Sequence, residues 1–470
     1  MPWVAGVDSS TGSTKVEVRD ADTGALVAGG SAPHPVTTPP RSEQDPAAWW
    51  RAFEAAWAAA GSPTVAAVSV AGQQHGMVAL DAARTVVRPA KLWNDTESAP
   101  DAGWLLKQLP GGAAAWAAAC GSVPVAAFTV TKLSWLHRSE PEHWAQLAHV
   151  LLPHDWLTYR LTGNLVTDRG DASGTGYWSP ASGEYRWDLL AIVDGERDWS
   201  DAVPRVLGPL DEAGSWNGAA VACGTGDNMA AALGAGLQPG DVAVSLGTSG
   251  TAYVVSDQPT ADASGFVAGF ADASGRYLPL VCTLNATKVT EAVRRLLGVD
   301  FGELDRLALA SSPGAGGLVL LPYLDGERTP NRPGATGVLA GLRSDVGREQ
   351  LARAAFEGVL CGLLDGIDAL ALVAPVAVGR LVLVGGGSHS RAYRQILADL
   401  TGRPVHVPDA GEHVAAGACV QAAALLHQRP PTEVAAAWGL GAGRMLEPTG
   451  AADAAAAVRE AYAARRDLEG

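Results

Sequence analysis

The sequence lacks the features that mark a secreted, membrane or nucleic-acid-binding protein. No basic segment followed by an apolar stretch opens the chain, so we expect no signal peptide and a cytoplasmic location. Asp365 and Asp368 interrupt the most apolar segment, so we expect no membrane partner. The five cysteines are widely spaced without a Cys-x-x-Cys pair, which favours buried free thiols over disulfides or zinc. Lysine is scarce and the formal net charge is −15, which argues against a nucleic-acid partner.

The composition is that of a compact folded chain with more than one domain. Apolar residues make up 47% of the 470 residues. A chain of this length exceeds one ordinary hydrophobic core, and we expect about two or three domains. No low-complexity linker separates them, so the organisation of the chain has to be inferred from its motifs.

A lone carboxylate, Asp227, lies between a glycine-rich bend and a predicted helix. Gly224 and Gly226 have no Cβ, so the backbone can turn sharply there and a ligand can approach it closely. Asp227 is then predicted to be the N-cap of the helix, where the helix dipole would keep its carboxylate ionised. The residue is a candidate catalytic base, and the alternative is a helix cap with no further role.

A predicted hairpin follows this segment. Residues 241–245 are expected to form a strand, residues 246–250 a tight turn and residues 251–255 the returning strand. The turn, Leu-Gly-Thr-Ser-Gly, offers backbone N–H groups and hydroxyls of the kind that bind phosphate oxygens. A small Gly/Ser/Thr turn can equally be a plain hairpin. A second copy of the pattern in the chain would favour phosphate binding.

Residues 4–18 supply that second copy. Their sequence again predicts a strand, a turn of small residues and a second strand. When the two segments are aligned, Thr11 takes the position of Thr248 and Thr14 takes that of Thr251. Two such hairpins can bind the β- and γ-phosphates of a nucleotide. The chain is therefore predicted to contain a duplicated nucleotide-binding unit.

The first hairpin also carries charged side chains suited to phosphate chemistry. Asp8 lies at the end of its first strand, where the carboxylate can hold Mg²⁺ through water. Lys15 adds a positive charge nearby. We therefore expect this hairpin to lie close to the phosphates and their metal ion.

Polar side chains follow the predicted strand at residues 65–71. Gln74 and His75 come directly after it, where ligands bind at the carboxyl ends of parallel strands, and they offer the mixed donors and acceptors that sugar hydroxyls require. Trp93 would add an aromatic wall. A histidine at this place can also be structural, and the polar loop at residues 168–175 could either reach a substrate or only turn the chain.

A second glycine run follows the predicted strand at residues 381–384. Residues 385–387 are all glycine, and a predicted helix begins at residue 391. A strand, a glycine run and a helix N-terminus can seat an adenosine and its α-phosphate, because the flat backbone lets the nucleotide lie close. The alternative is a tight packing turn.

Taken together, these segments resemble the FGGY family of carbohydrate kinases over nearly the whole chain. Each motif is weak alone, but their order and spacing are highly specific. Two residues depart from the usual family pattern, Ser10 in the glycine place of the first hairpin and Gln74 where methionine is common. The motifs that carry the resemblance are residues 8–15, 42–46, 72–76, 92–95, 171–175, 226–228, 245–250, 322–324, 326–330 and 385–387.

The resemblance implies an α/β fold with two duplicated ribonuclease-H-like domains around a central cleft, as in actin, hexokinase and chaperone ATPases. It divides the chain into an N-terminal domain, residues 1–241, with the sugar-binding loops, and a C-terminal domain, residues 242–470, with the adenosine site. Asp227 and Asp8 would be catalytic, and Asp8 would support Mg²⁺. The sugar would be bound by Gln74, His75, Trp93, Asp227 and Asn228, and ATP by Thr11, Lys15, Gly247, Thr248, Gly386, Gly387 and Ser390.

The activity that the resemblance implies is ATP-dependent phosphorylation of D-xylulose to D-xylulose 5-phosphate in pentose catabolism, with Asp227 taking the proton from the C5 hydroxyl. It also suggests a homodimer. Two alternatives stay open. The substrate could be another sugar or polyol, such as L-ribulose, L-fuculose, glycerol or gluconate. In a different class, the chain could be an actin- or chaperone-like ATPase that switches partner binding.

Overall fold

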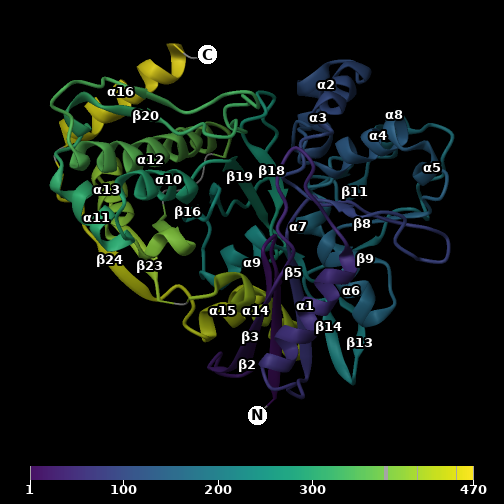
Figure 1. The fold of residues 1–470 in the computed structure, drawn as a ribbon. Helices are drawn as coiled ribbons and strands as arrows, with labels where there is room; N and C mark the ends of the chain where they lie inside the picture. The colour runs from purple at the N-terminus through teal and green to yellow at the C-terminus, as the bar shows by residue number, and fades with distance from the viewer. Residues whose placement is uncertain (1, 375–378, 410, 451, 469–470) are drawn as a thin grey trace. The chain divides into compact units, whose positions relative to one another are not determined.

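The computed structural model describes residues 2–374, 379–409, 411–450 and 452–468. The chain forms two compact units that are interleaved in sequence (Figure 1). The first comprises Met1–Leu237, Ser256–Leu278 and Ala410–Gly441, and the second comprises Gln238–Val255, Pro279–Asp409 and Ala442–Gly470. Two later segments of the chain thus return to the first unit. The single domain boundary at residue 241 stays a prediction.

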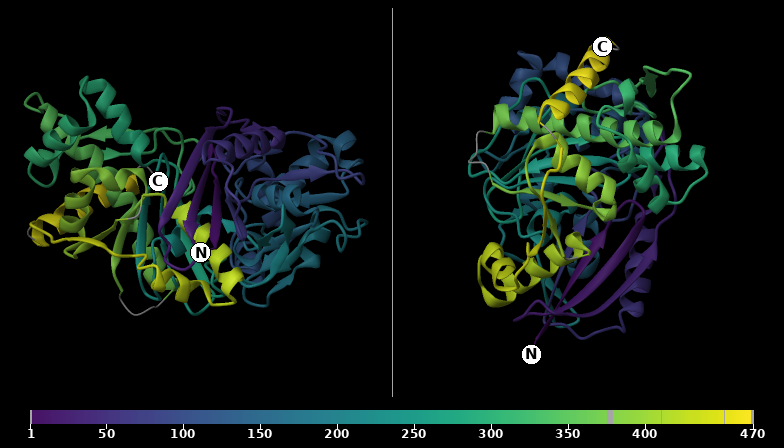
Figure 2. Two further views of the ribbon diagram at one scale, coloured as in Figure 1. Left: turned by 90° about the horizontal axis from the view of Figure 1, so that it is seen from below. Right: turned by 90° about the vertical axis from the view of Figure 1, so that its left-hand side faces the viewer.

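The first unit is built on a mixed sheet with the strand order β13-β14-β5-β1-β2-β3, and β15 also pairs with β5. The predicted first hairpin is confirmed as β1 (Trp3–Ser9) and β2 (Ser13–Asp20), drawn in purple in Figure 2. β5 (Ala67–Gly72) runs parallel to β1, and every residue of it is buried. The other strands of this sheet are β3 (Leu26–Pro33), β13 (Glu212–Trp216), β14 (Ala219–Ala222) and β15 (Thr225–Gly226).

The second unit repeats this topology. From β3 through β2, β1 and β5 to β14, neighbouring strands pair antiparallel, antiparallel, parallel and parallel. From β19 through β17, β16 and β22 to β23 the sequence of pairings is the same. The predicted duplicated α/β fold is thereby confirmed. The strands are β16 (Val242–Leu246), β17 (Gly250–Val254), β19 (Tyr277–Thr283), β22 (Leu381–Val384), β23 (Val405–Pro408) and β24 (Gly443–Leu446).

The two hairpins differ by one residue at their tips. Ser9 pairs with Thr14 in the first hairpin, whereas Leu246 pairs with Gly250 in the second. Residues 10–13 therefore form the first tip and residues 247–249 the second. The predicted match of Thr14 with Thr251 does not hold in the paired strands, because the shorter tip displaces the returning strand by one position.

One helix from late in the chain packs against the first sheet and against the helix that begins at Asp227. α14 (His413–His427) packs against β1, β5 and α9 (Asp227–Gly234). At the crossing of the two helices, a Cβ on Gly417 would lie 1.9 Å from the carbonyl oxygen of Ala230. Only glycine allows backbones to approach so closely. The helix that begins at Asp227 is thus held firmly against the sheet.

The remaining helices pack against the sheets or against one another. α1 (Pro46–Ala59) begins as predicted, with Asp45 as its N-cap. In the second unit, α12 (Arg348–Val373) packs against α10 (Thr287–Leu297) and α11 (Phe301–Ala310) (Figure 1). The other helices are α2 (Ala99–Gln108), α3 (Gly112–Cys120), α4 (Thr129–Ser139), α5 (Pro141–Trp144), α6 (Pro153–Thr162), α7 (Arg169–Ala172), α8 (Trp187–Val193), α13 (Arg391–Thr401), α15 (Pro431–Ala437) and α16 (Ala452–Leu468). Short strands and 3-10 turns complete the fold: β4 (Glu43–Gln44), β6 (Val78–Leu80), β7 (Ala90–Lys91), β8 (His149–Leu151), β9 (Val166–Asp168), β10 (Trp178–Ser179), β11 (Glu184–Tyr185), β12 (Arg205–Leu207), β18 (Ala268–Ala271), β20 (Val319–Leu321), β21 (Val338–Ala340), η1 (Ala315–Gly317) and η2 (Gly386–His389).

All five cysteines are buried and free, as predicted. In the part of the chain that the structure describes, no helix has both the length and the apolarity needed to cross a membrane.

Candidate active site

Strand register brings the predicted catalytic residues to one edge of the first sheet. Asp8 of β1 and Thr225 of β15 both lie opposite Ala71 of the central strand β5. The segments that follow these three strands therefore leave the sheet at the same level, with β1 and β15 about 10 Å apart across two strand spacings. This edge lies beyond the carboxyl ends of parallel strands, where α/β folds bind ligands.

Asp227 stands at this edge as the first residue of α9. Gly226, and not Asp227 as predicted, is the N-cap of the helix. The helix dipole does not keep the pKa of this carboxyl low. Dense protein surroundings, together with the nearby carboxyls of Asp8 and Asp171, raise the pKa of Asp227 to about 7, although part of the residue remains accessible to solvent. A carboxyl with such a pKa can act as a general base near neutral pH.

Asn228 links Asp227 to the predicted sugar loop. Its Nδ2 donates to Asp227 Oδ1 at 3.0 Å and to Gln74 Oε1 at 3.0 Å. Gln74 lies directly against Gly226, where a Cβ would be 2.7 Å from Gln74 Cγ. Gln74 Nε2 is buried without a hydrogen-bond partner among the described residues. The loop therefore presents an amide donor next to the candidate base.

His75 is held in a strained conformation by a tight fit. Its φ of 65° lies in the left-handed region, which costs a non-glycine residue energy. Its ring packs against Phe128 and Phe270, and Nδ1 lies 2.8 Å from the carbonyl oxygen of Gly174. Because a carbonyl can only accept, Nδ1 carries a proton, and in the neutral ring Nε2 is the acceptor. The ring packing and this hydrogen bond fix the orientation of the imidazole.

A second chain of hydrogen bonds joins the first hairpin to the sugar loops. Trp93 Nε1 donates to Thr11 Oγ1 at 2.9 Å, and this hydroxyl donates to Gln73 Oε1 at 3.2 Å. Gln73 Nε2 is buried without a partner among the described residues. The Thr11 hydroxyl thus contacts sugar-loop residues, and its contact with phosphate stays a prediction.

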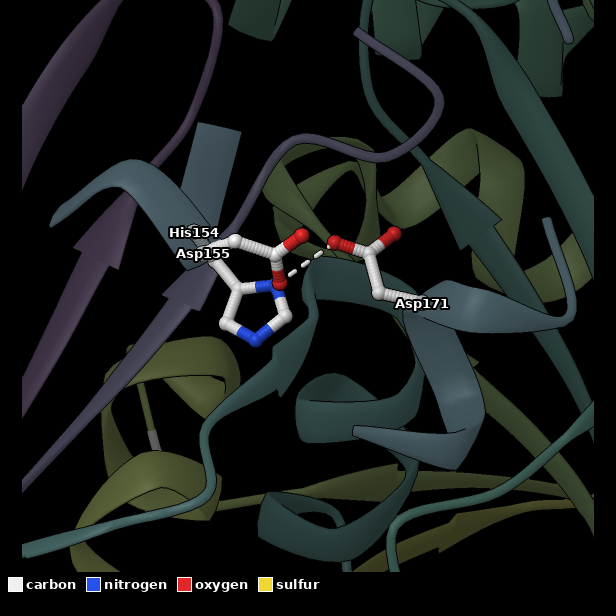
Figure 3. Close-up of side chains that lie close together, drawn as sticks. All are labelled: His154, Asp155 and Asp171. Atoms are coloured by element: carbon white, nitrogen blue, oxygen red, sulfur yellow. Dashed lines mark hydrogen bonds and ion pairs between the residues drawn. The ribbon is translucent and has the colours of Figure 1, made fainter. Parts of the chain in front are cut away.

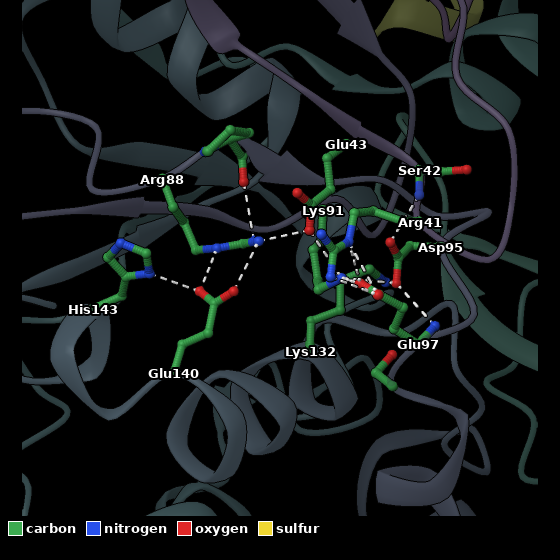
Figure 4. A network of polar contacts seen from close by, with 12 residues as sticks. Arg41, Ser42, Glu43, Arg88, Lys91, Asp95, Glu97, Lys132, Glu140 and His143 are labelled. Atoms are coloured by element: carbon green, nitrogen blue, oxygen red, sulfur yellow. Dashed lines mark hydrogen bonds and ion pairs between the residues drawn. The ribbon is translucent and has the colours of Figure 1, made fainter.

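A buried ionic network holds the loop that carries Trp93 (Figure 4). Lys91, wholly buried, lies 3.0 Å from Glu43, 3.0 Å from Asp95 and 2.6 Å from Glu97. Its ammonium group occupies the position between these carboxylates that a metal ion would need. Trp93 and Asn94 lie between two members of this network, so their backbone is anchored on both sides.

Asp8 fits the predicted role of supporting a metal ion. Its side chain is buried, and Oδ1 has no hydrogen-bond partner among the described residues. Burial, partly offset by Lys15, raises the pKa of Asp8 to about 7. An unpaired carboxylate oxygen of this kind is the ligand that Mg²⁺ prefers. Lys15 itself donates to Glu412 Oε2 at 2.6 Å, so its contact with phosphate stays a prediction.

The polar segment at residues 168–175, for which two interpretations were open, is buried beneath this edge. Asp168 caps the short helix α7 by accepting from the N–H groups of Gly170 and Asp171. Asp171 Oδ2 lies 2.6 Å from Nδ1 of His154 on α6. The sequence assigned no role to this pair, because no local pattern marks two residues that meet only through tertiary packing.

The predicted nucleotide residues of the second unit form a separate, backbone-built group. Gly247 and Thr248 are exposed at the hairpin tip, which Thr287 N fixes by donating to the Gly247 carbonyl oxygen at 3.0 Å. Gly385 has a φ of 82°, and a Cβ there would lie 2.7 Å from the carbonyl oxygen of Leu246. The glycine run therefore passes close to the hairpin, as a flat surface for a nucleotide requires.

The other predicted residues of this group differ in their surroundings. Gly386 is exposed with nothing near its Cβ position, whereas Gly387 is buried against the Leu246 side chain. Ser390 caps α13 by accepting from Tyr393 N, and its hydroxyl donates to Asp305 Oδ1 at 2.6 Å. Its side chain therefore serves the fold, and its contact with the nucleotide stays a prediction.

Comparisons with known proteins identify the family of the chain. The N-terminal domain model of the FGGY family of carbohydrate kinases matches residues 3–234, and the C-terminal domain model matches residues 242–426. The chain is 49% identical to the xylulose kinase of Streptomyces coelicolor, over 95% of this chain and 92% of that protein. It is 48% identical to that of Streptomyces rubiginosus, over the same shares. The crystal structure of xylulose kinase from Bifidobacterium adolescentis shares 43% identity, with a TM-score of 0.86 and 99% of each chain covered. The chain belongs to the FGGY family of carbohydrate kinases.

Proposed function

We propose that this protein transfers the γ-phosphoryl group of ATP to the C5 hydroxyl of D-xylulose, with Asp227 as the general base. The observation that carries the proposal is the place of Asp227. Its carboxyl has a pKa of about 7, remains partly accessible and is joined through Asn228 to Gln74 of the sugar loop. The names of the relatives at 49% and 43% identity support D-xylulose as the sugar.

The residues of the first unit would orient and activate the sugar. Gln74 Nε2 and Nε2 of His75 would bind hydroxyls as donor and acceptor, and the Trp93 ring would line the sugar site. Above its pKa, Asp227 would take the proton of the attacking hydroxyl as the O–P bond forms and the bond to ADP breaks. General-base catalysis of this kind contributes about 10²- to 10⁴-fold to a rate.

The nucleotide would be bound by residues of both repeats of the strand topology. Thr11 and Lys15 of the first hairpin and Gly247 and Thr248 of the second would bind phosphate oxygens, and the segment from Gly386 to Ser390 would border the adenosine. Asp8, with its unpaired buried oxygen, would hold Mg²⁺ through water. A bound Mg²⁺ would neutralise charge on the β- and γ-phosphates.

The test is ADP release by the purified protein with Mg-ATP, alone and with each of a panel of ketopentoses, aldoses and polyols. Strong stimulation confined to D-xylulose is expected. Stimulation by L-ribulose, L-fuculose, glycerol or gluconate instead would refute D-xylulose and direct attention to Gln74, which departs from the family's usual methionine. Steady ATP hydrolysis that no sugar stimulates would favour an ATPase that switches partner binding.

Two further predictions concern the assembly and the location of the protein. A homodimer is expected from the family resemblance, and light scattering after size-exclusion chromatography measures it directly. A cytoplasmic location is expected from the sequence, and fractionation of the source cells tests it.

A further inference from the structure

His154, which has no part in the proposed chemistry, is buried among three carboxylates beneath the active-site edge. Its Nδ1 lies 2.6 Å from Asp171 Oδ2 and 3.3 Å from Asp155 Oδ1 (Figure 3), and its Nε2 lies 3.9 Å from Asp168 Oδ1. His154, Asp155 and Asp171 are all 0% exposed and Asp168 is 3% exposed. Buried carboxylates at such separations need a nearby cation.

The imidazole supplies that cation. Burial alone would lower the pKa of His154, but the adjacent carboxylates of Asp155, Asp171 and Asp168 raise it to about 10. The ring is therefore an imidazolium at neutral pH. It donates from Nδ1 to Asp171, which fixes the orientation of that carboxylate.

Two contacts connect the cluster to the segment that carries Asp227. Asp168 Oδ2 accepts from Thr225 Oγ1 at 2.8 Å, two residues before the candidate base. The imidazole ring also touches the bend itself, because a Cβ on Gly224 would lie 2.6 Å from His154 Cδ2. A Cβ on Gly72, just before the sugar loop, would lie 2.9 Å from His154 Cβ. Histidine at this position thus supports both strand ends that form the site.

We propose that His154 is a positioning residue for phosphoryl transfer: its buried imidazolium neutralises and orients Asp168 and Asp171, and through Thr225 this cluster holds Asp227 in place for the sugar. This inference rests on the proposed function, because Asp227 is the group that it positions.

The test compares two substitutions at the same position by steady-state kinetics with the sugar that the wild-type protein phosphorylates. His154→Asn keeps an N–H donor but loses the charge, whereas His154→Lys keeps a positive charge. We expect His154→Asn to lower kcat roughly 10- to 100-fold, the size of effect that misplacement of a reacting group produces. KM for ATP should stay within about twofold in both variants, and His154→Lys should recover most of kcat.

The pH profile of kcat/KM separates positioning from plain structural support. The charged groups that face His154 are Asp155 on its own helix, Asp168 on β9 and Asp171 on α7. The negative charge of Asp171 in turn raises the pKa of Asp227. Loss of the cation leaves more negative charge around Asp227, so the acid limb in His154→Asn should move to higher pH. An unchanged kcat and acid limb in a folded His154→Asn would overturn the proposal, as would a His154→Lys variant no better than His154→Asn.

Two further measurements keep the proposal falsifiable if the His154 variants do not fold. Thr225→Val removes the hydroxyl that donates a hydrogen bond to Asp168, while it keeps the side-chain shape. This variant should have a lower kcat and an unchanged KM for ATP. Full activity of Thr225→Val would contradict the proposed connection. A stoichiometric metal ion in the purified wild-type protein that is lost in His154→Asn would also overturn it, in favour of a metal site. A failure of the proposed function is a different result, since wild-type ADP release would then not respond to any sugar.

Discussion

The candidate active-site edge of the first unit offers mainly side-chain groups, whereas the glycine-rich group of the second unit offers mainly backbone groups. The first consists of carboxyl side chains: Asp8, which is buried, and Asp227, which is partly accessible, both have pKa values raised to about 7. The second consists mainly of backbone, with exposed Gly247 and Gly386 and a left-handed Gly385. A proton acceptor needs an adjusted pKa, whereas phosphates need N–H groups and close approach. The repeated strand topology therefore serves two chemistries, and changes in each unit should have separable consequences.

The largest effect is expected for the base itself. Asp227→Asn keeps the size of the side chain and its place at the start of α9 but removes the proton acceptor. We expect kcat for D-xylulose to fall by about 10²- to 10⁴-fold. ATP binding, measured by calorimetry, should stay nearly unchanged. Glu184→Gln removes a carboxylate from an exposed strand of the same unit and serves as the control, with wild-type kcat expected.

A backbone change in the second unit should weaken the binding of ATP and leave the binding of the sugar unchanged. Gly385→Ala places a methyl group 2.7 Å from the Leu246 carbonyl oxygen at a φ of 82°. We expect KM for ATP to rise about tenfold, equal to about 1.4 kcal/mol. Sugar affinity should not change. Gly334→Ala, where a Cβ would meet nothing within 4 Å, is the matched control. If Gly385→Ala weakened sugar binding instead, the two units would not divide the work as proposed.

The raised pKa of Asp227 also predicts a pH-dependent stability. Its pKa is about 7 in the folded protein against an ordinary value of 3.8, so the folded state holds a proton that the unfolded state has lost. That stabilisation is complete below about pH 4 and is lost as the pH rises through about 7. At about pH 8, Asp227→Asn should therefore have a free energy of unfolding roughly 1–2 kcal/mol larger than that of wild type, and it should melt at a higher temperature. The difference should vanish near about pH 4. A variant less stable than wild type at both pH values would count against the raised pKa.

The smallest effect is expected for the ion pair of the first hairpin. Lys15 and Glu412 have side chains that are 35% and 48% exposed, so the pair should stabilise the fold by no more than about 1 kcal/mol. Lys15→Met and Glu412→Gln should then melt almost alike. If Lys15 also binds phosphate, KM for ATP should rise in Lys15→Met only. Equal KM values in the two variants would assign Lys15 to the ion pair alone.

Local patterns explain which parts were predicted from sequence. The two hairpins, the strand before Gln74 and the strand before the glycine run each show a short apolar run that ends in small or polar residues, and all four are confirmed. The order of such motifs was enough to identify the family. Their roles depend on residue type and local geometry, which a sequence displays directly.

What escaped prediction depends on tertiary packing. The carboxylates around His154 come from segments that meet only in the fold, and the return of α14 to the first unit follows from its packing against α9. The same reason accounts for Asp227. Its local position at a helix start suggested an ionised carboxylate, but burial beside Asp8 and Asp171 raises its pKa. The tertiary surroundings thus outweigh the effect of the local position at the helix start on this pKa.

The measurement that tests the central claim most directly is the pH dependence of kcat/KM for D-xylulose between about pH 5 and about pH 9, with saturating Mg-ATP. If Asp227 is the base, kcat/KM should rise tenfold per pH unit on the acid side and level off above a midpoint near 7. A rate that stays constant down to about pH 5 would contradict the account, because a base with this pKa would be protonated and inactive there.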